Sequence, residues 1–219
     1  WGHLEPERGK PAERTGYDTA AAAQAAAGLA TLQVFHSTPG WAVDTELDGK
    51  EAWKRFPRDL RDLHAFCRAM AVRYRGQVQA WEPWNEANIT GFGGHTAAEM
   101  CTLQKAAYLG FKAGDPGLVV GWNVYAGSPS EVQKDIILAN ETWPYYDTFN
   151  VHTYSGVESY LADFAPAIAA ACGKPLWLSE CGIRLQFVTP PPAGELSPED
   201  AWRQACFLPK SYADRKSTV

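Results

Sequence analysis

Apolar and polar residues alternate along this chain with two periods. Short apolar segments, which predict strands, recur between longer segments whose apolar residues return every third or fourth position, which predicts helices. The predicted strands are 29–36, 78–81, 118–123, 148–154 and 176–180, with the end of a strand in 1–10 and the start of another at 217–219. The predicted helices are 18–28, 58–74, 97–113, 129–139, 155–172 and one that begins at 197.

Helix starts are marked by capping residues. Thr96 with Glu99 forms one capping box, and Ser128 with Glu131 forms a second in which Pro129 takes the first helical position. Gly28 fits the C-terminal stop of an Ala-rich helix. These signals place the loops between strands and helices.

The regular exchange of strand and helix predicts a parallel sheet with right-handed crossovers. No strand is followed by a glycine fingerprint of the G-x-G-x-x-G or G-x-x-x-x-G-K kind, which disfavours a nucleotide-binding sheet. We therefore expect an α/β barrel of the TIM type, with residues 1–219 in a single domain.

Composition and charge narrow the function classes. The 219 residues are 46% apolar and 21% charged, which is typical of a soluble globular protein. The net charge of −5 and the absence of a basic run argue against a nucleic-acid surface. No run of about 18 apolar residues predicts a membrane span. The chain opens with Trp1 and shows no signal peptide, and the sequence does not assign the protein to a cellular compartment.

The cysteines and histidines predict no metal centre. Five cysteines are scattered and odd in number, so neither a disulfide framework nor a zinc pattern follows. The histidines form no H-x-H or H-E-x-x-H motif. We expect no cofactor. The residues in question are Cys67, Cys101, Cys172, Cys181, Cys206, His3, His36, His64, His95 and His152.

Polar residues gather where the predicted strands end. In an α/β barrel these ends form the catalytic face. In 148–154 we expect Asn150, His152 and Tyr154 to point into the barrel, and in 176–180 we expect Leu176, Leu178 and Glu180 to share a face. The polar groups expected at the rim are His36 with Trp41, Asn85 with Glu86, Trp122 with Asn123, His152 with Tyr154, and Glu180.

Two glutamates, Glu86 and Glu180, each end an otherwise apolar strand. They lie three strands apart around the predicted barrel, so we expect them to face each other across its mouth. Glycoside hydrolysis needs such a pair, with one carboxyl protonated and the other ionised. Tyr154 is placed to donate a hydrogen bond to Glu180 and to keep it ionised.

Two segments resemble the signatures of clan A glycoside hydrolases, with family 39 the closest in character and family 5 next. The segments are Trp84-Asn85-Glu86 after an apolar strand and Trp177-Leu178-Ser179-Glu180-Cys181-Gly182 on a later one. Supporting resemblances lie in Glu5-Pro6-Glu7-Arg8-Gly9, in Thr38-Pro39-Gly40-Trp41 and in the stretch from Asp147 to Tyr154. Ala87 stands where the family usually has Pro. The Arg of the second strand and the aromatic residue of the eighth, both usual in the clan, are not present.

The resemblance implies a (β/α)8 barrel of the TIM type. Counted against it, residues 1–219 are one partial barrel catalytic domain that runs from the end of the second strand to the start of the eighth. The resemblance also implies a retaining β-glycosidase that acts on a glycoside or polysaccharide. It assigns Glu86 as the general acid/base and Glu180 as the nucleophile. Asn85 would bind the sugar 2-hydroxyl, Tyr154 would orient Glu180, and His152 would line the same subsite. Trp41 and His36 are further candidate sugar contacts.

Two alternatives stay open. The first is a carbohydrate-binding module or pseudoenzyme that keeps the cleft without turnover, and the missing strands favour it. The second is a metal-dependent barrel hydrolase, which the scattered histidines disfavour. In the leading interpretation the partners are a carbohydrate substrate and a further segment or chain that completes the barrel.

Overall fold

The computed structural model describes residues 1–44, 51–183 and 196–214. Its strands are β1 (Leu32–Phe35), β2 (Ala80–Pro83), β3 (Val119–Val120), β4 (Tyr125–Ala126), β5 (Phe149–Thr153) and β6 (Leu176–Cys181). Its α-helices are α1 (Gly16–Ala26), α2 (Leu60–Arg73), α3 (Ala97–Gly114), α4 (Glu131–Ala139), α5 (Tyr160–Asp163), α6 (Ala165–Ala170) and α7 (Pro198–Asp214). Five 3₁₀ turns join them: η1 (Gly40–Ala42), η2 (Ala52–Lys54), η3 (Thr90–Phe92), η4 (Trp143–Tyr145) and η5 (Val157–Ser159).

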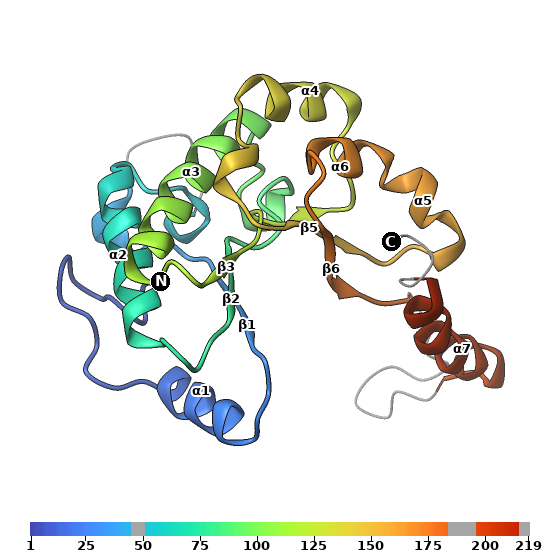
Figure 1. Cartoon of the computed structure of the whole chain (residues 1–219), viewed down its shortest axis with the longest axis horizontal. Helices are drawn as coiled ribbons and strands as arrows, with labels where there is room; N and C mark the ends of the chain where they lie inside the picture. Colours follow the sequence, from blue (N-terminus) through green and yellow to red (C-terminus); the bar gives the residue numbers. More distant parts are fainter. Residues whose placement is uncertain (45–50, 184–195, 215–219) are drawn as a thin grey trace.

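The strands are all parallel and follow one another in sequence order. One sheet has the order β1-β2-β3 and the other β4-β5-β6. A parallel bridge between Gly121 and Thr148 joins the two sheets, so 119–126 is one interrupted strand between β2 and β5. Figure 1 shows the helices arranged around the outside of this curved wall of strands. The parallel (β/α) architecture predicted from the sequence is confirmed.

Aromatic rings fill the space between the strands and the outer helices. Trp81 of β2 stacks on Phe111 of α3 with ring centroids 5.3 Å apart. Trp122 stacks on Phe149 of β5 at 5.2 Å, and both rings are fully buried. Several of the nine tryptophans are therefore packed in the core, and the number of tryptophans alone is poor evidence of sugar binding.

Helices α2 and α3 pack with little space between their backbones. A Cβ atom at Gly110 would lie 2.4 Å from the His64 carbonyl oxygen and 2.9 Å from Cys67 Cβ. At Gly114 it would lie 2.6 Å from Ala71 Cβ. The two glycines, one helical turn apart, allow the helices to approach closely.

We therefore expect Gly110→Ala to lower the free energy of unfolding by about 1–3 kcal/mol, the usual cost of overpacking a core. The matched control is Gly16→Ala at the start of α1, where a new Cβ would meet no atom within 4 Å. Denaturant unfolding measures both changes. Equal stability of the two variants would contradict the close-packing argument.

One side of the strand wall is open. Within the described residues β1 pairs only with β2 and β6 pairs only with β5. A cavity of about 860 Å³ reaches from Leu32 of β1 to β6 and the α5–α6 segment, where Phe164, Trp177 and Leu178 line it. The arc of strands therefore does not close within the described residues, as expected for a partial barrel.

The first ten residues contain no strand, contrary to expectation. Residues 2–4 form a turn, and Glu7 and Lys10 make an isolated antiparallel bridge. The Trp1 and Gly2 nitrogens nevertheless donate to the carbonyl oxygens of His36 and Ser37 at 2.7 and 3.2 Å, so the chain starts beside the end of β1.

Helix α4 begins later than predicted. Ser130, rather than Ser128, is the N-cap, and Gln133 completes the capping box. Pro129 disfavours a helical conformation at Ser128, and Ser130 with Gln133 forms an equally good box two residues later.

The helix predicted over 155–172 is broken into η5, α5 and α6. Phe164 has φ −99° and ψ 5° between α5 and α6, and Pro166 follows within the first turn of α6. Proline cannot donate the helical hydrogen bond and disfavours continuation of the preceding turn, which accounts for the break.

One predicted feature, the strand start at 217–219, lies outside the described residues. The predicted last helix is present as α7, with the Asp200 amide donating to Ser197 Oγ at 3.1 Å. Among the described residues, every helix is too short or too polar to cross a lipid bilayer.

Candidate functional site

Strand β2 ends in a strained turn that carries Asn85 and Glu86. Trp84 has φ 110° and Glu86 has φ 44°, both in the left-handed region that non-glycine residues rarely adopt. Trp84 is fully buried, its Nε1 donates to the Phe92 carbonyl at 3.0 Å, and its ring meets Phe56 edge-on at 5.1 Å. Packing holds the strained backbone in place, a situation typical of functional sites.

The loop after β2 is fixed to the neighbouring strand through Asn88. The Asn88 amide donates to the Ala126 carbonyl at 3.2 Å and accepts from the Ala126 amide at 2.9 Å. The Ile89 amide donates to the Glu86 carbonyl at 3.1 Å. Glu86 is thus held at the carboxyl ends of β2 and β4 before any ligand arrives.

Glu86, His152 and Glu180 converge at these strand ends. His152 Nδ1 lies 3.1 Å from Glu86 Oε1 and 3.8 Å from Glu180 Oε2. One carboxylate oxygen of each glutamate and the imidazole nitrogen all lie within 4.8 Å of one another. The side chains of His152, Glu86 and Glu180 are 4%, 14% and 49% exposed. The two glutamates therefore differ in environment, one nearly enclosed and the other open to solvent.

An irregularity in β6 decides which way Glu180 points. Val151 pairs with Leu178, but the next residue of β5, His152, pairs with Glu180, so Ser179 is an extra residue. Directly paired residues of parallel strands share a face, and a bulge reverses the alternation. Glu180 therefore shares a face with His152 and not with Leu178. The prediction that Leu176, Leu178 and Glu180 share a face is wrong.

Tyr154 donates a hydrogen bond from its hydroxyl to Glu180 Oε1, as the sequence predicted. This bond, with burial and the negative charge of Glu180, raises the pKa of Tyr154 to about 12. The phenol therefore stays protonated at neutral pH and can act as a donor. Gly182 leaves room for the ring, since a Cβ there would lie 2.9 Å from Tyr154 Cε1.

Asn85 lies next to Glu86 in the strained turn and is half-buried. In the part of the chain that the structure describes, the side-chain amide of Asn85 makes no hydrogen bond. It is therefore available to a ligand at the rim.

His36 lies beside this group but is not part of it. Its ring contacts are with Trp53, Trp84 and Phe92, at centroid distances of 6.0, 6.5 and 5.6 Å, and its Nδ1 lies 2.6 Å from Ser37 Oγ. Burial lowers the pKa of His36, which favours the neutral ring.

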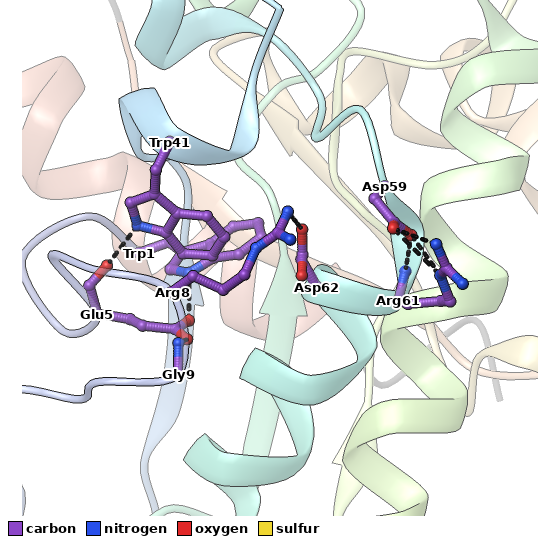
Figure 2. Close-up of polar contacts among 8 residues, drawn as sticks. All are labelled: Trp1, Glu5, Arg8, Gly9, Trp41, Asp59, Arg61 and Asp62. Atoms are coloured by element: carbon purple, nitrogen blue, oxygen red, sulfur yellow. Dashed lines mark hydrogen bonds and ion pairs between the residues drawn. The ribbon is translucent and has the colours of Figure 1, made fainter.

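Trp41 is engaged elsewhere, as Figure 2 shows. Its Nε1 donates to the Glu5 carbonyl at 3.1 Å, the Arg8 guanidinium lies 5.5 Å from its ring centroid, and Trp1 packs edge-on at 5.7 Å. Arg8 is itself held by Asp62 at 2.6 Å. Trp41 therefore anchors the N-terminal loop, and its indole is not grouped with the glutamates.

Trp122 and Asn123 do not face the rim. Trp122 belongs to the buried aromatic core, and Asn123 Nδ2 donates to the Met100 carbonyl at 2.7 Å and to Gln104 Oε1 at 3.2 Å, both on α3. The irregular backbone between β3 and β4 turns these side chains toward the helices, which a regular strand pattern could not indicate.

The sequence reasoning assigned no role to Glu82, Asn88 or Asn150. Glu82 could have been found, because a carboxylate in the apolar strand Trp81–Pro83 needs a buried partner. The structure supplies that partner: Asn150 Nδ2 donates to Glu82 Oε1 at 2.6 Å.

The same three residues also have the composition of a cation site. Each of Glu86, His152 and Glu180 offers one ligand atom within 4.8 Å of the other two. The sequence predicted that these residues share the rim, but the spacing of its histidines predicted no metal site, and chelation tests metal dependence.

No protein-family model matches the chain, and no curated protein matches it by sequence. Solved structures do match. A family 39 glycoside hydrolase from Bacteroides cellulosilyticus WH2 superimposes with a TM-score of 0.64 at 17% identity, over 98% of this chain and 46% of that one. A psychrophilic family 10 endo-β-1,4-xylanase gives 0.61 at 15% identity, over 97% and 70%. A glucosidase from Croceicoccus marinus gives 0.61 at 18% identity, over 88% and 41%.

This chain spans 41% of the glucosidase, 46% of the family 39 enzyme and 70% of the xylanase. The likeness extends over nearly all of this chain and only part of each of the others. The fold implied by the resemblance to clan A is therefore confirmed: the chain has the fold of glycoside hydrolase barrels in a partial form.

Proposed function

We propose that this protein is a retaining β-glycosidase in which Glu86 is the general acid/base and Glu180 the nucleophile. The observation that carries the proposal is the approach of two carboxylate oxygens within 4.8 Å at the carboxyl ends of β2 and β6. Retaining enzymes hold their carboxyl groups about 5–5.5 Å apart and inverting enzymes about 6.5–9.5 Å, so the short separation favours a covalent intermediate.

The two environments suit the two roles. Glu86 is nearly enclosed beside His152, so its carboxyl can be held against the leaving oxygen away from bulk water. Glu180 is half exposed and accepts a hydrogen bond from Tyr154, which can hold its carboxylate toward the sugar for attack. His152 lies between them and would line the same subsite, and the Asn85 amide would bind the sugar 2-hydroxyl.

The stereochemistry of the product tests this proposal. The full-length protein is offered a panel of aryl β-glycosides, and ¹H NMR follows which anomer forms first. The β-anomer is expected. First formation of the α-anomer would exclude double displacement. Sugar binding without turnover would favour the binding-module alternative, and loss of activity on chelation with EDTA would favour a metal-dependent hydrolase.

Tyr154→Phe isolates the hydrogen bond to Glu180. Its loss leaves one oxygen of the attacking carboxylate without its donor, so kcat should fall about tenfold, roughly the value of one charge-assisted hydrogen bond. Tyr17→Phe is the matched control, since Tyr17 is 51% exposed on α1. An unchanged kcat for Tyr154→Phe would remove Tyr154 from the mechanism.

We also propose that a further segment of this polypeptide completes the barrel over the cavity between β1 and β6. The apolar lining of that cavity and the single pairing of each flanking strand within the described residues support this. Fluorescence of an apolar dye such as ANS compares residues 1–219 with the protein that includes its flanking coding sequence. Strong binding by the short form alone is expected, and equal binding by both would contradict the proposal.

A further inference from the structure

A third carboxyl group lies inside the barrel, and the proposed mechanism does not use it. Glu82 is on β2, the middle strand of its sheet, and is 3% exposed. Its Oε1 accepts from Asn150 Nδ2 of β5 at 2.6 Å, a bond that spans the barrel interior past the interrupted strand 119–126. Burial raises the pKa of Glu82, and the hydrogen bond from Asn150 and the nearby His152 oppose this.

The orientation of the Asn150 amide is fixed by its surroundings. Thr148 Oγ1 donates to Asn150 Oδ1 at 2.7 Å, which leaves Nδ2 directed at Glu82. Gly121, on the strand between, keeps the space that the amide occupies, because a Cβ there would lie 2.5 Å from Asn150 Nδ2. Glu82, Thr148 and Gly121 together thus restrict the Asn150 side chain to one position.

Asn150 precedes by two residues the part of β5 that contributes His152 to the site. It pairs with Trp177 in regular register, and the irregularity that brings Glu180 opposite His152 follows one residue later. Asn150 and His152 are two residues apart on the same face of β5, about 6–7 Å along the strand. Any movement of Asn150 would therefore be passed to His152 through a short length of backbone.

We propose that Glu82 is a positioning residue which, by holding Asn150, fixes His152 between Glu86 and Glu180; this inference rests on the function proposed above. A buried, hydrogen-bonded carboxyl group commonly contributes no more stability than apolar packing of the same volume. A role in geometry accounts for its presence in β2 where a role in stability does not.

Three variants test the proposal in the full-length protein. Glu82→Met removes the acceptor at similar volume and should lower kcat about 10–100-fold, the usual effect of losing an outer-shell partner, with KM changed less than about twofold. Glu82→Gln keeps an acceptor for Asn150 and should retain kcat within about fivefold. Gly121→Ala displaces Asn150 from the other side and should reproduce the Met phenotype. Asn123→Ala is the control, since it breaks a buried hydrogen-bond pair facing α3 and should lower stability without lowering kcat.

A second readout does not depend on activity. The ¹⁵N resonances of the His152 ring, assigned with His152→Gln, report the environment of Nδ1. They should move in Glu82→Met and Gly121→Ala and stay in place in Glu82→Gln and Asn123→Ala. If the unmodified protein hydrolyses no glycoside, the proposed function fails while this comparison still tests the positioning role.

Either of two results would overturn the inference. One is an unchanged kcat and unchanged His152 resonances in Glu82→Met, or in Gly121→Ala should the Met variant not fold. The other is a loss of kcat in Asn123→Ala equal to that in Glu82→Met, which would show that Glu82 acts on general stability alone.

Discussion

Glu180→Ala is expected to abolish hydrolysis, with a loss of about 10⁴–10⁶-fold in kcat, the range observed when a nucleophile or its partner is removed from an enzyme that forms a covalent intermediate. The fold should be unaffected, because the Glu180 side chain is 49% exposed and its polar contacts among the described residues are with the rim residues Tyr154 and His152. Sugar binding should persist for the same reason. Steady-state kinetics and ligand titration measure the two effects separately.

Small anions provide a second test of this prediction, in which lost activity is recovered. Azide or formate can enter the space that the carboxylate vacates and attack the sugar directly, so activity should return in part with a product of inverted configuration. Glu131→Ala is the matched control, since Glu131 is a 71% exposed helix glutamate paired with Lys134 at 2.6 Å. Normal turnover by Glu180→Ala would remove this residue from the mechanism.

Glu86→Gln is expected to separate substrates by their leaving groups. A protonated carboxyl matters most when the departing oxygen is strongly basic, so kcat/KM on alkyl glycosides and disaccharides should fall by about 10²–10⁴-fold. Activated aryl glycosides such as dinitrophenyl derivatives, which leave without protonation, should lose far less in the first step. Glutamine retains the size of the side chain within the strained turn, so the geometry of Trp84 and Asn85 should be preserved.

Glu131→Gln is again the matched control. Equal losses on all leaving groups would show that Glu86 does not act as the acid, and a loss of the folded state would show that its contact with His152 at 3.1 Å is mainly structural. Thermal unfolding measured beside the kinetics distinguishes these outcomes.

Much of the fold was predictable from local signals. The amphipathic pattern over 58–74 predicted α2 almost to its ends, because a helical period that repeats over about four turns is a strong signal. The capping box of Thr96 and Glu99 located the start of α3 to the residue. Signals shared by neighbouring residues were less reliable: Ser128 and Ser130 offer competing caps, and only the packed structure selects the second.

The site was predictable in its residues but less so in its geometry. Strand order alone placed Glu86 and Glu180 on facing strands, and the inward face of β5 correctly grouped His152 and Tyr154. The bulge at Ser179, which turns Glu180 inward, is a property of pairing between β5 and β6 and has no local signature. Trp41 remains a candidate sugar contact, and its bond to the Glu5 carbonyl is a contact that the sequence did not indicate.

Trapping the covalent intermediate tests the assignment of Glu180 as the nucleophile most directly. A 2-deoxy-2-fluoro glycoside with an activated leaving group slows both steps and leaves the sugar attached to the nucleophile, and peptide mass spectrometry then locates the label. We expect stoichiometric labelling of the full-length protein at Glu180 and nowhere else. A label on any other residue, or turnover of the reagent with no label at all, would contradict the assignment of Glu180 as the nucleophile of a retaining glycosidase.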